Sequence, residues 1–175
     1  MKIAIVPFGQ VDRKVLEHLE AALKETFGKE CEILPPLPIP AFAYNPTRRQ
    51  YLSDLFLDEL SKLEAEGALK VLGVTEVDLY TRGLNFVFGQ ARLGGREAVI
   101  SLARLHQSFY GLPEDEELLL ERSLKEAVHE LGHTWGLAHC PDHLCVMHFS
   151  NSLRDTDVKT ARFCSKCFSI LKSRL

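Results

Sequence analysis

Apolar residues in the first two thirds of the chain form short runs and helical stripes, which predict alternating strands and helices. A helix is expected over residues 12–27, just before Gly28, and another from Thr47 to Gly67. Short apolar runs typical of strands occur at four places, which are residues 2–6, 32–34, 69–74 and 98–102. Strands that alternate with helices favour an α/β (or α+β) fold with a mixed, twisted sheet.

Two segments between these elements have patterns of their own. Residues 34–46 hold five prolines, which lack a backbone donor and therefore predict an extended loop. Residues 84–93 predict a strand that Gly94 and Gly95 close with a turn. Because this strand alternates less clearly, we interpret it as a sheet edge, where one side of the backbone is free to pair.

The last third of the chain begins with a long helix. Acidic residues 114–117 suit a helix start, because negative charge there stabilises the helix dipole, and the helix is expected to run to about Trp135. A short cysteine-rich tail follows it. No linker divides the sequence, so we expect one domain over residues 1–175, with an upper lobe of about 1–135 and a lower lobe of about 136–175.

Composition and charge narrow the classes of function. Hydrophobic residues make up 46% and charged residues 26% of the chain, values that exclude a disordered or low-complexity protein. A net charge of −3 argues against nucleic acid as a main partner. No run of about 18 apolar residues predicts a membrane span, and the N-terminus lacks a signal-peptide core. We therefore expect a cytoplasmic protein, and a monomer by default.

Three of the seven histidines form the motif H-E-x-x-H-x-x-G-x-x-H. His129 and His133 lie four residues apart on a helix, so both rings point to the same face and can bind one ion. Gly136 permits a turn that brings His139 back as a third ligand. Glu130 lies beside the ion, where it can hold a water without being a ligand. Three imidazoles leave a fourth position open, which indicates a catalytic rather than a structural zinc.

This pattern resembles that of the metzincin metallopeptidases. Members of that clan carry a methionine in a turn beneath the zinc, and Met147, eight residues after His139, matches it. Some branches place a tyrosine two residues after the methionine as an extra zinc ligand. That position is Phe149 here, so the resemblance provides no such ligand.

Four of the five cysteines lie in the last 36 residues, and they are Cys140, Cys145, Cys164 and Cys167. Four thiolates suit a tetrahedral zinc ion, and a C-x-x-C pair supplies two sulfurs from one tight turn. Iron in such a site is geometrically possible, so the spacing alone does not fix the metal. Two disulfides are the alternative, which a cytoplasmic location disfavours.

With Cys140 directly after His139, the whole string from Val128 to Cys167 resembles the archaemetzincin family. The resemblance implies a second, structural zinc held by the four cysteines. It also implies a metzincin-like fold, in which the long active-site helix is followed by a small lobe with the methionine turn. In metzincins the strand at residues 85–96 forms the upper rim of the cleft, which makes Gly89, Gln90 and Ala91 the expected substrate strand.

These residues predict a zinc-dependent peptidase that acts on peptides or proteins, with two zinc ions per chain. Catalytic zinc would lower the pKa of its water, and Glu130 would act as general base and then protonate the leaving amine. One alternative is a zinc-stabilised peptide-binding protein with little or no turnover, which an intact Glu130 disfavours. The other is a zinc hydrolase of a non-peptide bond, since the ligands do not specify the bond attacked.

The adjacent histidine and cysteine sites have a further consequence. Because His139 and Cys140 share a peptide bond, the structural metal should stabilise the loop that carries the third histidine and Met147. We assign neither His143 nor His148 to a metal, because three histidines and four cysteines already complete two sites.

Overall fold

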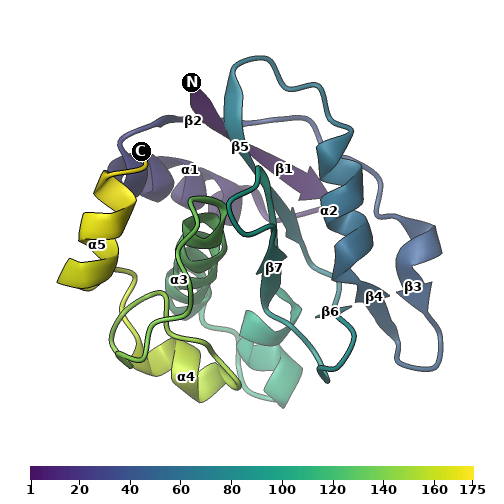
Figure 1. Cartoon of the computed structure of the whole chain (residues 1–175). Helices are drawn as coiled ribbons and strands as arrows, with labels where there is room; N and C mark the ends of the chain where they lie inside the picture. The colour runs from purple at the N-terminus through teal and green to yellow at the C-terminus, as the bar shows by residue number, and fades with distance from the viewer.

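A computed structural model describes residues 1–175, and a five-stranded sheet lies at its centre (Figure 1). The strand order is β2-β1-β5-β8-β7. The first four strands are parallel, and their bounds are Glu30–Ile33 for β2, Lys2–Phe8 for β1, Ala68–Thr75 for β5 and Glu97–Ser101 for β8. The edge strand β7 (Gly89–Ala91) pairs with β8 in the antiparallel direction. The predicted α/β fold with a mixed sheet and an edge strand is therefore confirmed.

Helices cover both faces of this sheet. Helices α1 (Arg13–Phe27) and α3 (Glu116–Thr134) pack on one face, and α2 (Ser53–Ser61) packs on the other (Figure 1). Strand β1 alternates between the two layers, as a buried strand must. Ile3 and Ile5 join the apolar cluster under α1 and α3, whereas Val6 joins the cluster under α2.

The predicted helix from Thr47 to Gly67 is wrong at both ends, since α2 spans only Ser53–Ser61. The Asn45 side-chain oxygen accepts hydrogen bonds from the backbone N–H groups of Thr47 and Arg48, and it holds them in a turn instead. Around this turn lies a small sheet of β3 (Tyr44–Asn45), β4 (Gln50–Leu52) and β6 (Leu79–Tyr80). The proline-rich loop thus ends in a strand.

The predicted strand over residues 84–93 is reduced to Gly89–Ala91. In the residues just before β7, the carbonyl oxygens of Leu84 and Asn85 accept hydrogen bonds from the Arg48 guanidinium instead of from a strand. Val87 makes a single bridge to Leu79 rather than a ladder with β8. Residues 84–88 therefore form a connecting segment beside the sheet.

The long helix expected up to Trp135 is confirmed as α3. Asp115 caps its start by accepting a hydrogen bond from the Leu118 N–H. Glu114 is not merely solvated, since its carboxylate accepts hydrogen bonds from the Ser108 N–H and from His106. These partners belong to the 3₁₀ segments between β8 and α3, which are Ala103–Leu105 and Gln107–Tyr110. A third 3₁₀ segment spans Ala41–Ala43.

The cysteine-rich tail contains two helices that the pattern did not predict, α4 (Leu153–Val158) and α5 (Ser165–Lys172). Helix α4 contacts α3, and α5 is the last helix before the C-terminus (Figure 1). The Arg122 guanidinium of α3 pairs with Asp157 of α4 through two hydrogen bonds of 2.8 and 2.9 Å. No helix in the structure is long and apolar enough to cross a bilayer. The division of the chain into two lobes stays a prediction.

Candidate active site and metal centres

The last two turns of α3 and the loop after them bring three histidines together. His129 and His133 come from the helix, and His139 follows the turn at Gly136, whose φ is +86°. The ligating nitrogens of all three rings lie within 4.8 Å of one another. His129 Nε2 and His133 Nε2 are 3.1 Å apart, close to the ~3.3 Å expected between two nitrogens of a tetrahedral zinc site.

Backbone carbonyls orient two of these rings. His129 Nδ1 donates to Val146 O at 2.8 Å, and His133 Nδ1 donates to Leu137 O at 2.7 Å, which leaves each Nε2 lone pair free toward the shared centre. Burial lowers the pKa of His129 well below its usual value, and burial also lowers the pKa values of His133 and His139. Neutral imidazoles with a fixed tautomer are the form that binds a metal ion.

Met147 packs against α3 at Gly132, next to His133 in sequence. Its side chain is fully buried, and its sulfur occupies the space that a Cβ on Gly132 would need, at 2.5 Å from the ideal Cβ position. Gly132 lies on α3 between the first two histidines of the motif. The methionine therefore packs against the active-site helix within the histidine motif.

Glu130 points from α3 toward the edge strand. Its Cγ and Oε1 lie 2.8 and 3.0 Å from the position that a Cβ on Gly89 would take. Burial, with a smaller contribution from the Glu126 carboxylate, raises the pKa of Glu130 well above its usual value. Together with His129, this carboxylate lines a pocket. The edge strand and the motif helix thus meet at Glu130.

The free edge of β7 adjoins this carboxylate. Phe88 and Arg92 form backbone hydrogen bonds with β8, and such bonds alternate along an antiparallel strand. The N–H and C=O groups of Gly89 and Ala91 therefore point away from β8, at an edge with no partner strand. Gln90 is held from the side, since its amide donates to Asp54 of α2 at 2.5 Å.

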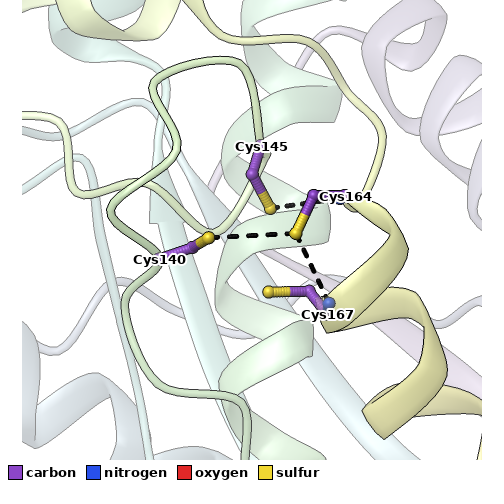
Figure 2. Close-up of side chains that lie close together, drawn as sticks. All are labelled: Cys140, Cys145, Cys164 and Cys167. Atoms are coloured by element: carbon purple, nitrogen blue, oxygen red, sulfur yellow. Dashed lines mark hydrogen bonds between the residues drawn. The ribbon is translucent and has the colours of Figure 1, made fainter.

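The four cysteines converge between the loop after His139 and the start of α5, as Figure 2 shows. Their sulfurs lie within 4.8 Å of one another, and all of them are free thiols, so the disulfide alternative is not what the structure shows. Cys140 Sγ and Cys164 Sγ are 3.9 Å apart, against ~3.8 Å expected for two thiolates of a tetrahedral zinc site. The donor set and its spacing fit such an ion.

Backbone N–H groups also point at these sulfurs. Cys145 Sγ accepts from the Met147 and Cys164 N–H groups at 3.5 and 3.3 Å, and Cys164 Sγ accepts from the Cys167 N–H at 3.4 Å. That last bond lowers the pKa of Cys164, whereas burial raises the pKa values of Cys145 and Cys167. Cys31 lies elsewhere, half-buried on β2, and burial raises its pKa to about 11.

The two clusters are joined by more than the peptide bond between His139 and Cys140. The Cys140 N–H donates to Met147 O at 3.0 Å, and His148 Nδ1 bonds to Cys140 O at 2.8 Å. His148 thus has a structural partner, and the exposed His143 stacks edge-on against it with ring centroids 5.0 Å apart. Hydrogen bonds to both the N–H and the C=O group of Cys140 therefore fix the loop that connects the two clusters.

A buried ion pair behind Glu130 was missed by reasoning from the sequence. Lys159, which is fully buried, lies 3.4 Å from Glu126 and donates to His148 O at 3.1 Å. Thr156 also donates to Glu126, at 2.9 Å. The spacing of Glu126 and Glu130 places both on one face of α3. The sequence does not indicate that Lys159 of the tail pairs with Glu126, because no periodic pattern marks Lys159 as buried.

Known proteins share both the sequence and the fold of this chain. The model of the family described as Peptidase family M54 matches residues 29–173. An archaemetzincin of Methanocaldococcus jannaschii is 51% identical over 174 residues, which cover 99% of this chain and 94% of that protein. The chain belongs to peptidase family M54. Another archaemetzincin, from Pyrococcus furiosus, is 51% identical over 179 residues, with 99% and 93% covered.

Solved structures agree with this family. The crystal structure of archaemetzincin from Methanopyrus kandleri has a TM-score of 0.89 at 44% identity and covers 99% of this chain and 94% of that one. A zinc-dependent peptidase from Methanocorpusculum labreanum has a TM-score of 0.84 at 28% identity, with 97% and 99% covered. The archaemetzincin resemblance drawn from the motif is confirmed. As a member of family M54, the chain is a zinc metallopeptidase, a hydrolase.

Proposed function

We propose that this chain hydrolyses peptide bonds with Glu130 as its general base, beside a zinc ion held by His129, His133 and His139. The observation that carries the proposal is the position of Glu130. Its carboxylate comes from the same helix as two of the three converging histidines and faces the free edge of β7. A pure zinc-binding fold has no need of a buried carboxylate at that place.

The three imidazoles fit zinc because they are neutral and closely spaced, and because carbonyl groups orient two of them. Zinc bound there would polarise a water molecule and stabilise negative charge on the carbonyl oxygen under attack. Glu130 accepts a proton from the attacking water and later delivers it to the leaving amine nitrogen. Burial raises the pKa of Glu130, which favours the proton uptake that a general base performs.

The substrate peptide pairs with the free edge of β7. The outward N–H and C=O groups of Gly89 and Ala91 supply backbone hydrogen bonds of the kind that an added strand uses. We place the peptide antiparallel to β7, because that pairing is the more stable of the two. The bond to be cleaved then lies over Gly89, next to Glu130.

The second zinc ion belongs to Cys140, Cys145, Cys164 and Cys167, and its role is structural. Four thiolates complete a tetrahedral shell and leave no open position for a substrate or water. The site closes the tail onto the loop that carries His139 and Met147. We therefore propose two zinc ions per chain. The cytoplasmic location and the monomeric state stay predictions from the sequence.

The proposal is tested with a large mixed peptide library. Zinc-loaded protein and its Glu130→Ala variant are each incubated with the library, and the products are identified by mass spectrometry. Cleavage by the natural chain that is lost in Glu130→Ala supports the proposal and gives the sequence preference on both sides of the cleaved bond.

Two other results would contradict it. If neither protein cleaves any peptide while both hold their zinc, the chain is a peptide-binding protein or acts on another bond. If the Glu130→Ala variant cleaves as fast as the natural chain, Glu130 is not the general base.

A further inference from the structure

Strand β5 has a lysine where its pattern calls for an apolar side chain. Lys70 lies on the same face of the strand as Leu72 and Val74, which belong to the apolar cluster under α1 and α3. The residue is nevertheless only 7% exposed. A buried ammonium group is costly for the folded state unless acceptors surround it, so the partners of Lys70 show what the lysine is for.

Two backbone carbonyl groups accept hydrogen bonds from the Lys70 ammonium. One is the Gly95 oxygen, at 2.6 Å, which belongs to the turn between β7 and β8. The other is the oxygen of Thr134, the last residue of α3, at 2.8 Å. The lysine thus joins the turn that follows β7 to the end of the helix that carries His129 and His133.

A backbone hydrogen bond makes the same connection beside the lysine. The Gly94 N–H donates to His133 O at 2.8 Å. Gly94 has a φ of +69°, a conformation that a glycine adopts without strain. It lies three residues after Ala91, the last residue of β7. The end of the edge strand is therefore fixed next to one of the three histidines.

The end of α3 favours a cation at this place. The last carbonyl groups of a helix have no partner within it, and the helix dipole gives them partial negative charge. Arg174 donates to the next carbonyl oxygen, that of Trp135, at 2.9 Å. Of these two cations, only Lys70 also hydrogen-bonds to the turn after β7. The lysine therefore does more than neutralise the helix end.

The other side-chain bonds of the edge strand lead to a different element. Gln90 donates to Asp54, and Arg92, directly after β7, pairs with Asp58. Both aspartates belong to α2, on the opposite face of the sheet. These bonds fix β7 relative to α2, so its hydrogen-bonded connection to α3 depends on the turn that Lys70 holds.

We propose that Lys70 is a positioning residue, which aligns a peptide bound to β7 with the histidines and Glu130 of α3. The inference rests on the proposed function, because it assumes that the peptide pairs with β7 and that Glu130 acts on it. Lys70 itself touches neither of them. Its effect reaches the reaction through the turn, and a displacement of about 1 Å is enough to lower a rate about 100-fold.

Lys70→Met tests the proposal, because methionine keeps an apolar side chain but donates no hydrogen bond. We expect kcat for peptide cleavage to fall at least about tenfold, because the bond to be cleaved is misaligned. KM should change less than about threefold, because the free edge of β7 is kept. Lys70→Arg, which can also donate to two carbonyl groups, should restore kcat to within about threefold of the natural chain.

Lys125→Met is the matched control. Lys125 is also a buried lysine, 4% exposed, and it donates to two carbonyl oxygens, those of Thr156 and Asp157 in α4. Its loss should destabilise the fold but leave kcat and KM unchanged. Zinc content and circular dichroism are measured on every variant. Lys70→Gln, which keeps an amide donor, replaces Lys70→Met if that variant does not fold, and the same fall in kcat is expected.

A second measurement does not depend on turnover. Hydrogen exchange followed by NMR reports on the Gly94 N–H that is bonded to His133 O. In Lys70→Met this amide should exchange at least about tenfold faster, because the turn is held less firmly. The Arg92 N–H bonds to Glu97 O within the sheet, so its exchange should not change.

The outcomes separate this inference from the proposed function. Values of kcat and KM in Lys70→Met that match those of Lys125→Met overturn the inference. A rise in KM with kcat unchanged also overturns it, and so does an unchanged exchange rate at Gly94. If the natural chain cleaves no peptide but Gly94 exchanges faster in Lys70→Met, the proposed hydrolysis fails and the role of Lys70 in holding the turn on α3 stands.

Discussion

Gly89 has no side chain at the one place where the edge strand must pass close to Glu130. A methyl group there would lie 2.8 Å from Glu130 Cγ and 2.6 Å from the carbonyl oxygen of Val99. Neither neighbour can yield easily, because the carbonyl belongs to β8 and the glutamate is buried. The missing side chain of Gly89 therefore permits the close approach of Glu130, and no turn requires a glycine at this position.

Gly89→Ala should displace the Glu130 carboxylate and lower kcat/KM about 100-fold or more, as small misplacements of catalytic groups do. Peptide cleavage and zinc content are measured on the same sample. The matched control is Ala91→Gly, which removes a methyl group from the same face of β7 and creates no clash. Full activity of Gly89→Ala with an intact fold would contradict the close contact.

At the scale of single residues, the sequence predicted those that belong to a spaced motif. It missed residues that come together only in the folded chain. His129, His133 and the cysteines repeat at recognisable intervals, and the structure brings each set together. The family resemblance predicts Met147 below the zinc, but no spacing predicts that its sulfur fills the space next to Gly132. Lys159 has no pattern at all, because its burial depends on the path of the tail.

The connection between β8 and α3 depends on a histidine held by two carboxylates. His106 lies 2.8 Å from Glu76 and 2.9 Å from Glu114, on opposite ring nitrogens. Burial alone would lower the pKa of His106, but these two hydrogen bonds outweigh it and raise the pKa above its usual value. Hydrogen bonds from Ser108 and His106 lower the pKa of Glu114 to about 2.

The stability of this connection should therefore depend on pH. A raised histidine pKa stabilises the fold fully below the unfolded pKa of ~6.5, and the contribution is lost as the pH rises through the folded value. His106→Gln should lower the free energy of unfolding by about 0.5–1 kcal/mol near pH 5.5, because the pair is partly exposed. The effect should shrink by pH 8.5, and an equal loss at both pH values would contradict this account. Chemical unfolding at fixed free zinc measures it.

The tail is held on α3 by the buried pair of Lys159 and Glu126. Lys159→Met should lower the free energy of unfolding by about 3–5 kcal/mol, because it leaves a buried carboxylate without its partner. The double variant with Glu126→Gln should recover part of this loss. Lys62→Met, which breaks an exposed pair with Glu59, is the control and should cost less than about 1 kcal/mol. A loss for Lys159→Met no larger than this control would contradict a buried pair.

Elements were predicted well where one period extends over several turns. Helices α1 and α3 follow such a period, the strands of the parallel sheet follow short apolar runs, and the structure confirms both. The helix expected from Thr47 fails because the Asn45 side chain holds a turn there. Helices α4 and α5 span only 6 and 8 residues, which is too short for a clear stripe, and packing against the rest of the fold stabilises them instead.

Across the whole molecule, the cysteine site and the histidine site are arranged as one unit. The Cys140 N–H donates to Met147 O, so the loop with the third histidine is closed by both clusters. Arg174, near the chain end, adds a hydrogen bond to Trp135 O at 2.9 Å, beside the turn at Gly136. A lower segment of this size has little apolar core of its own, and a structural zinc would stabilise it.

Cys164→Ser should therefore weaken zinc binding at the histidines, although Cys164 is not among them. We expect zinc affinity there to fall about 10–100-fold, the range for residues that orient a ligand from a distance. Competition with a chelator measures it, with Cys31→Ser on β2 as the control for losing a thiol. Normal zinc occupancy of the histidine site in Cys164→Ser would refute the coupling.

The central claim is that one chain carries two zinc ions with separate roles, one hydrolytic and one structural. Zinc counted per chain by native mass spectrometry, with peptide cleavage assayed on the same samples, tests it most directly. The account predicts two zinc ions in the natural chain, and one zinc with no cleavage in His133→Ala. A single zinc in the natural chain, or cleavage that persists in His133→Ala, would contradict it.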